Sequence, residues 1–188
     1  MYGIILAKGE KSRRIGKIKA FIEIEGITII ERMINEILDI FEKIIIVTTK
    51  PEIFEKIKNV EIVFDEYKIG PIGGILKGLQ VSPHFYNFIF ACDYPFLNKD
   101  IVRYMIEIEK DYDVLIPKKG NSIHPLFAIY SKRTIPVIEK NIIMKKYRVF
   151  DLLNELNVKY LERIKDFDYL FFNLNRKEDI KKLWEREF

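Results

Sequence analysis

The sequence has little of what marks secreted, membrane or nucleic-acid-binding proteins. A single cysteine among 188 residues excludes a disulfide framework and is typical of a protein from a reducing cytosol. No apolar run approaches the length of a membrane span, and no signal peptide precedes the first apolar stretch. The net charge of +4 is too small to favour a nucleic-acid partner. We therefore expect a cytoplasmic protein that binds neither nucleic acid nor membrane.

Two common phosphate-binding motifs are also absent. The spacing of Gly9 and Gly16 does not match the Walker loop, and the dinucleotide fingerprint G-x-G-x-x-G does not occur. What the sequence does have is an apolar run, residues 4–7, that opens into a loop with five cations between residues 8 and 17. Glycine lets backbone N–H groups approach phosphate oxygens, and Lys or Arg neutralises their charge. The opening loop is therefore a candidate phosphate-binding loop.

Segments with the pattern of strands alternate with segments of helical periodicity. This alternation predicts one domain over residues 1–188, with a three-layer α/β/α, Rossmann-like fold and a mainly parallel, mixed sheet. A capping box, Thr28 to Glu31, predicts where the first long helix begins. The predicted strands are residues 4–7, 43–48, 60–64, 86–91, 113–117, 125–130 and 169–174. The main predicted helices are residues 30–41, 51–58, 71–79, 98–110, 149–156 and those from 176 onward.

Polar motifs follow four of the predicted strands at the point where each strand ends. They are the opening loop, Asp65, Asp93 and the pair Asn173 and Asn175. In open α/β sheets, ligands bind beyond the carboxyl ends of the strands. The convergence of these motifs at one edge is more informative than any one of them. Each has a plain alternative, because an Asp at a strand end often bonds to its own turn.

Asp93 is the candidate metal ligand. A carboxylate at the end of an apolar strand can hold Mg²⁺, which uses few protein carboxylates and keeps phosphate oxygens as further ligands. We expect the neighbouring Cys92 to pack rather than react, because nothing in the sequence suggests an adjacent base.

A glycine-rich stretch, residues 70–79, is expected to turn the chain into a helix. Four glycines in nine residues cost backbone entropy, so a close approach of another group is expected there. Gly78 lies inside the predicted helix, where Ala would be favoured, which indicates that a ligand or a strand packs against it.

Taken together and in this order, the motifs resemble those of the molybdenum cofactor guanylyltransferases, a family of small nucleotidyltransferases. The family signature L-A-G-G, then R-M-G-x-x-K, corresponds here to residues 6–9 and 14–19. The later motifs are G-P-x-G-G, Cys-Asp-x-Pro, His-Pro and N-x-N. Three departures are clear: Lys8 replaces a glycine, the loop is one residue longer, and Thr48 stands where the family often has Asn.

The resemblance implies transfer of GMP from GTP to the terminal phosphate of molybdopterin, with Mg²⁺ and release of pyrophosphate. Molybdoenzymes or their chaperones would be further partners. Carried over residue by residue, it assigns catalysis to Arg14, Lys19 and Asp93, with Asp93 holding the metal. It assigns nucleotide binding to Leu6, Ala7, Lys8, Gly9, Lys19, Asp65, Gly74, Gly78 and Asp93. It assigns substrate contacts to His124, Asn173 and Asn175.

Several alternatives stay open at the level of sequence. The chain could be the cytidylyltransferase for the same cofactor or another small-phosphate guanylyltransferase. Lys8 and the longer loop would also suit a nucleotide-binding domain without catalytic activity. A phosphosugar nucleotidyltransferase is disfavoured by the short chain. For single residues, a lone His124 is often structural, and Asn175 has Glu178 three residues on, as a helix N-cap would.

Overall fold

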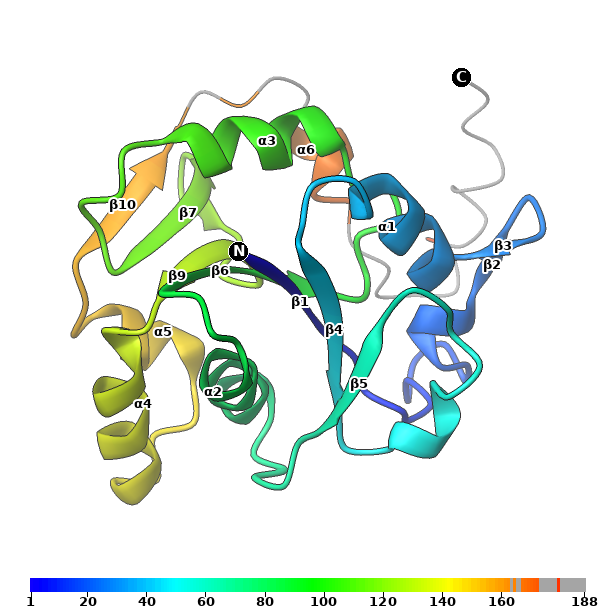
Figure 1. Ribbon diagram of the computed structural model, residues 1–188, viewed down its shortest axis with the longest axis horizontal. Coiled ribbons are helices and arrows are strands. Elements are labelled where there is room, and N and C mark those ends of the chain that lie inside the picture. Colours follow the sequence, from blue (N-terminus) through cyan, green and yellow to red (C-terminus); the bar gives the residue numbers. More distant parts are fainter. Residues whose placement is uncertain (163, 165–166, 173–178, 180–188) are drawn as a thin grey trace.

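A central sheet organises the molecule, shown as a computed structural model in Figure 1. The structure describes residues 1–162, 164, 167–172 and 179. In that part of the chain the sheet has eight strands in the order β10-β7-β9-β6-β1-β4-β5, with β8 paired to β7. Neighbours on this path are parallel, except that β9 runs antiparallel to both β6 and β7. The predicted mixed, mainly parallel sheet is confirmed.

The strand bounds follow the apolar runs of the sequence. The strands are β1 Tyr2–Leu6, β4 Lys43–Thr48, β5 Glu61–Phe64, β6 Tyr86–Ala91, β7 Val114–Lys119, β8 Ser122–Ile123, β9 Phe127–Ser131 and β10 Val158–Leu161. A separate small hairpin joins β2 Glu23–Ile24 and β3 Ile27–Thr28.

Helices cover both faces of the sheet. In Figure 1, α1 (Ile29–Ile37), α3 (Lys99–Glu107) and α6 (Phe167–Leu170) lie on one face, and α2 (Pro71–Val81), α4 (Thr134–Ile143) and α5 (Val149–Leu153) lie on the other. Short 3-10 turns, Lys19–Phe21 and Pro51–Ile53, lie in the loops. Successive β1 residues enter different cores: Ile5 packs in the first cluster and Ile4 in the second. The three-layer prediction is confirmed.

No helix among the described residues is long and apolar enough to cross a membrane.

Local capping sets where two helices begin. The Thr28 hydroxyl accepts a hydrogen bond from the Glu31 N–H at 3.3 Å, and the Glu31 carboxylate accepts one from the Thr28 N–H at 3.2 Å. Asn98 caps α3 by accepting bonds from the N–H groups of Asp100 and Ile101. Both caps satisfy backbone donors that the first turn of a helix leaves free. The capping box predicted from sequence is confirmed.

The prediction of a last strand at residues 169–174 is wrong for residues 169–172, and residues 173–174 lie outside the described residues. Residues Phe167–Leu170 form α6, and the last described strand is β10, earlier in the chain. The aromatic residues of this segment stack on other rings: Tyr169 lies 4.5 Å from Phe96, between ring centroids. An aromatic-rich run has the composition of a strand, but here ring packing decides its conformation. The helix predicted from residue 176 onward lies outside the described residues.

Glycines on α2 let this helix pack closely on β1. A Cβ atom on Gly78 would lie 2.6 Å from Cγ2 of Ile4, and one on Gly74 would lie 3.0 Å from Cδ2 of Leu6. The first distance is shorter than real Cβ contacts allow. The close neighbour that the sequence predicts for Gly78 is therefore a strand.

We expect Gly78→Ala to destabilise the protein, although Ala favours a helix over Gly by about 1 kcal/mol. Ile4 is branched at Cβ and buried, so its Cγ2 methyl cannot move away from the added Cβ, and overpacking of this kind costs about 1–3 kcal/mol. Gly74→Ala is the matched control, since it meets the flexible end of Leu6. Urea unfolding checks this: a Gly78→Ala protein more stable than the Gly74→Ala protein would contradict it.

Candidate functional site

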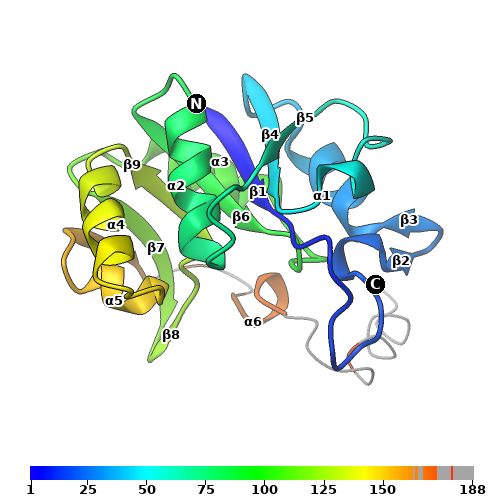
Figure 2. The ribbon, with the colours of Figure 1, turned by 90° about the horizontal axis from the view of Figure 1, so that it is seen from below.

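The carboxyl ends of four parallel strands meet at one edge of the sheet. The strands β1, β4, β5 and β6 share this direction, so the segments that follow them lie side by side. Backbone hydrogen bonds continue past the strand ends: Ala7 N–H donates to Val47 O at 3.1 Å, and Cys92 N–H donates to Leu6 O at 3.2 Å. Figure 2 shows the opening loop, in blue, and α6, in orange, at this edge. We call it the active edge below.

Lys19 and Asp93 meet at this edge. The Lys19 Nζ lies 2.8 Å from Oδ2 of Asp93, although 74 residues separate the two in sequence. The side chains are 22% and 18% exposed, so the pair is partly desolvated but still open to a ligand. The structure thus brings together the predicted phosphate-neutralising cation and the predicted metal ligand. A phosphate and a cation could bind there with charges already in place.

The opening loop is folded on itself and anchored to the core. The Ser12 N–H donates to Lys17 O, and the Gly16 N–H donates to Ser12 O at 2.7 Å, with Gly16 at a φ of 79° that favours glycine. Ile15 is buried in the core below. Gly9 is buried too, and a Cβ on it would lie 2.6 Å from Cβ of Lys50. The loop therefore has a defined shape.

Two predicted site residues of this loop, Lys8 and Arg14, are exposed. Among the described residues, neither of them makes an ion pair within 4 Å. The structure therefore shows no ion pair between Arg14 and Asp93, the predicted site residue that Lys19 contacts.

Asp65 shapes the turn that follows β5. Its Oδ1 accepts hydrogen bonds from the N–H groups of Tyr67, at 3.0 Å, and Lys68, at 3.3 Å. Burial of the carboxyl group raises its pKa, and the two backbone donors oppose that shift. The chain then turns at Gly70, at a φ of 83°, into α2. Asp65 therefore forms hydrogen bonds with its own turn, which was the plain alternative for this residue. Its contact with a nucleotide stays a prediction.

His124 lies on the far side of Asp93, in the connection from β8 to β9. Its Nδ1 is 3.4 Å from the Tyr94 hydroxyl, and its Nε2 is 3.3 Å from Oγ of Ser122. Its ring stacks on Phe171 with 3.9 Å between centroids. Burial lowers the pKa of His124 to about 4, and the charge of Asp93 only partly opposes this. The imidazole is therefore neutral at pH 7.

Cys92 is buried, and burial raises the pKa of its thiol to about 12, helped by the charge of Asp93. A thiol with a raised pKa is a poor nucleophile at neutral pH. The prediction that Cys92 packs is confirmed, because it lies in the main core cluster, and its lack of reactivity stays a prediction. Asn173 and Asn175 lie outside the described residues.

Sequence reasoning missed two residues that the structure places against His124. They are Tyr94, the variable position of the Cys-Asp-x-Pro motif, and Phe171. A signal was present for Tyr94, because a phenol beside a predicted metal ligand can serve as a hydrogen-bond donor. No pattern in the sequence singles out Phe171 among the aromatic residues around it.

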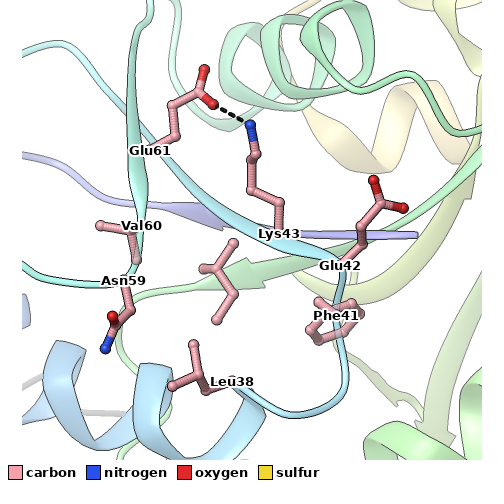
Figure 3. A pocket seen from close by; sticks show the side chains of 8 residues that line it. Leu38, Phe41, Glu42, Lys43, Asn59, Val60 and Glu61 are labelled. Atoms are coloured by element: carbon pink, nitrogen blue, oxygen red, sulfur yellow. Dashed lines mark hydrogen bonds and ion pairs between the residues drawn. The ribbon is translucent and has the colours of Figure 1, made fainter.

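A hollow of about 400 Å³ lies at the opposite edge of the sheet (Figure 3). Its lining includes the first residues of β4 and β5, Lys43 and Glu61, which form an ion pair with 2.9 Å between Nζ and Oε2. The carboxyl ends of those strands, by contrast, point to the active edge. The hollow is therefore separate from the site around Lys19 and Asp93.

Comparison with known proteins identifies the family of this chain over nearly its whole length. The MobA-like NTP transferase domain matches residues 3–158. A probable molybdenum cofactor guanylyltransferase of Clostridium perfringens is 34% identical over 181 residues, covering 96% of this chain and 88% of the relative. A molybdenum cofactor guanylyltransferase of Desulfosudis oleivorans is also 34% identical, covering 96% and 92%.

A solved structure shows the same architecture. Molybdopterin-guanine dinucleotide biosynthesis protein A of Archaeoglobus fulgidus superposes with a TM-score of 0.84 at 27% identity, covering 98% of this chain and 97% of that one. The shared architecture and the sequence similarity agree, and the chain belongs to the MobA-like NTP transferase family.

Proposed function

We propose that this protein is a molybdenum cofactor guanylyltransferase, which transfers GMP from GTP to the terminal phosphate of molybdopterin and releases pyrophosphate. The observation that carries the proposal is the contact of Lys19 with Asp93 at the active edge, in a chain whose relatives bear that name. The whole chain, residues 1–188, would act as one nucleotidyltransferase domain. Molybdoenzymes or their chaperones are the partners we propose for delivery of the product.

The reaction is an in-line displacement at the α-phosphorus of GTP. An oxygen of the acceptor phosphate forms the new P–O bond, and the bond to the bridging oxygen of the β-phosphate breaks. Pyrophosphate leaves with the electron pair of that bond. The acceptor phosphate is already ionised at neutral pH, so no strong general base is needed. Catalysis then depends on positioning and on stabilising charge as it develops. The protonated Cys92 and the neutral His124 agree with this chemistry, since neither is prepared as a nucleophile or a cation.

Lys19 is the central charge donor of this mechanism. Its ammonium group is held at the active edge by Asp93 and can contact phosphate oxygens without a large movement. Arg14, exposed on the same loop, would add a second cation on the solvent side. Residues 6–9 would contribute backbone contacts to the nucleotide, while Asp65 would approach it from the end of β5.

The residues at the active edge fit a Mg²⁺ ion. Among the described residues, no three His, Cys, Asp or Glu side chains converge on one point, so one carboxylate would be the main ligand. That suits Mg²⁺, which keeps several waters and phosphate oxygens around few carboxylates. Asp93 would hold it, and when bound the ion would neutralise phosphate charge. We propose Asn173 and Asn175 as the residues that assist there.

His124 marks the acceptor side of the site. It lies beyond Asp93 from the opening loop, on the connection between β8 and β9. A neutral imidazole can donate one hydrogen bond to an acceptor oxygen without adding charge. We therefore propose that His124 orients the acceptor rather than the nucleotide.

The experiment that tests the function is turnover of each of the four nucleoside triphosphates with molybdopterin and Mg²⁺. The expected result is release of pyrophosphate with GTP, together with the guanine dinucleotide product by mass spectrometry. Preferential turnover of CTP would assign the cytidylyltransferase instead. Absence of turnover with every nucleotide would support a non-catalytic nucleotide-binding domain.

Asp93→Asn should abolish most turnover without unfolding the protein. The amide keeps the size of the side chain but removes the charge that holds both Lys19 and the metal. Loss of one preorganised group in comparable sites costs on the order of 100-fold or more in turnover. Turnover at several Mg²⁺ concentrations and a thermal unfolding scan check this. Near-normal turnover at ordinary Mg²⁺ would exclude Asp93 as the metal ligand.

Lys19→Ala should reduce turnover far more than Lys11→Ala. Lys19 contacts Asp93 and is mostly buried, whereas Lys11 is exposed on the same loop and serves as the matched control. The expected loss for Lys19 is about 3–4 kcal/mol of barrier, which is roughly a 100- to 1000-fold lower rate. Steady-state kinetics measure both variants. An equal loss in the two would mean that the loop contributes only general positive charge.

The lowered pKa of His124 predicts how stability depends on pH. Between its folded pKa of about 4 and an unfolded pKa of about 6.5, the unfolded chain binds more protons than the folded one. This contribution to stability is therefore complete above about pH 6.5 and is lost as the pH falls toward 4. Among the described residues, the polar and charged groups that act on His124 are Tyr94, Ser122 and Asp93.

Urea unfolding of the protein without ligand, at pH 7 and pH 5, measures this dependence. His124→Gln should reduce the loss of stability between the two pH values. His84→Gln is the control, because that histidine bonds to Glu42 away from the active edge. Equal loss in the wild type and in His124→Gln would show that His124 is not buried in its neutral form.

A further inference from the structure

Among the residues that the structure describes, Phe171 makes a closer ring contact with His124 than Tyr94 does. The two rings lie nearly parallel, with 3.9 Å between centroids and 14° between planes. Phe171 is only 7% exposed, and the rings of Tyr94 and Phe127 meet it edge-on at 5.8 Å and 5.2 Å. The imidazole therefore lies against the ring of Phe171, whose own rotation is restricted by the rings of Tyr94 and Phe127.

Two contacts with described residues meet the ring nitrogens of His124. They are long, at 3.4 Å to the Tyr94 hydroxyl and 3.3 Å to Oγ of Ser122, where hydrogen bonds weaken. Rotation of the imidazole out of its plane would break both of these contacts, and the stack on Phe171 opposes that rotation. The ring contact therefore adds a constraint on the direction of the two ring nitrogens.

Phe171 is itself anchored independently of His124. The preceding helix, α6, is joined to the end of β7 by an ion pair between Lys119 and Asp168. Tyr169 stacks on Phe96, with 4.5 Å between centroids and 22° between planes. Leu170 is fully buried. These contacts hold the segment that carries Phe171 in place before an acceptor binds.

We propose that Phe171 is a positioning residue that holds the His124 imidazole with Nδ1 toward Tyr94 and Nε2 toward the acceptor. We assign the Tyr94 hydroxyl as the donor to Nδ1, so that the proton of the neutral ring is on Nε2, the nitrogen that faces Ser122. An acceptor oxygen would take the place of Ser122 at that N–H. Because the His124 ring is already oriented, it loses little conformational entropy when the acceptor binds, and this lowers the KM for that substrate. The kinetic part of this inference rests on the proposed function.

Nuclear magnetic resonance tests the geometry without any substrate. The chain has two histidines, so the imidazole signals are few, and His84→Gln assigns them. In the wild type we expect ring protons of His124 shifted upfield by the stacked phenyl ring, and ¹⁵N shifts of the Nε2–H form. Phe171→Leu should remove the upfield shift, and Phe171→Tyr should keep it. Unchanged His124 signals in Phe171→Leu, or a proton on Nδ1 in the wild type, would overturn the inference.

Kinetics separate a positioning role from a merely structural one. Phe171→Leu should raise the KM for molybdopterin roughly five- to tenfold, with the KM for GTP within about twofold of the wild type. Phe171→Tyr should restore the wild-type value. In a His124→Gln background, Phe171→Leu should have no further effect, because the two residues act as one unit.

Phe96→Leu is the matched control for the packing of α6, since it loosens the same segment through Tyr169. It should lower stability with a smaller effect on the KM for molybdopterin. Additive effects of Phe171 and His124, or equal increases in both KM values, would show that Phe171 is only structural. If the wild type transfers no GMP, the proposed function fails, and the magnetic resonance signals alone decide whether Phe171 positions His124.

Discussion

The parallel register of β1 with its two neighbours is the constraint on which the site depends. Hydrogen bonds just past the strands, from Ala7 to Val47 and from Cys92 to Leu6, keep three strand ends level. Because the ends are level, the opening loop and Asp93 face each other across a short distance, and Lys19 can reach the carboxylate. The glycine face of α2 supports this arrangement from below, since it lets the helix lie directly on β1.

The chemistry of the site follows from the residues that this register assembles. The carboxylates of Asp65 and Asp93 and several cations lie at the active edge, and the single cysteine of the sequence is buried, which raises the pKa of its thiol. Such a site can bind a polyphosphate and a metal, and it can stabilise charge on phosphate oxygens. It does not offer a nucleophile of its own. A reaction in which one phosphate attacks another requires only that the site bind both reactants and stabilise the charge on their phosphate oxygens, because the attacking phosphate is already ionised.

An aromatic group joins Asp93, the metal ligand that we propose, to His124, which we propose contacts the acceptor. Tyr94 follows Asp93 directly in the chain, and its ring contacts both His124 and Phe171. A shift of the segment that carries Phe171 would therefore affect His124 and the loop of Asp93 together. Burial of these rings also keeps His124 neutral, because a charged imidazole would be poorly solvated there.

The sequence by itself determined the order of the elements and the chemistry at the strand ends. The largely apolar run of residues 43–48 is typical of a buried strand in a parallel sheet, and a basic, glycine-containing loop after the first strand indicates phosphate binding. Parallel topology then predicts that Asp93 lies near that loop, because carboxyl ends of parallel strands share an edge. The contact of Lys19 with Asp93 agrees with this reasoning.

Only the tertiary structure decided what each of these residues touches. Local patterns could not tell whether Gly78 meets a ligand or Ile4, because the neighbour belongs to another element. They could not tell that residues 167–170 form a helix, since ring stacking on a distant loop outweighs the strand composition of the segment. The neutral state of His124 has the same origin: it depends on burial beside Phe171, which is a property of the folded chain and not of any motif.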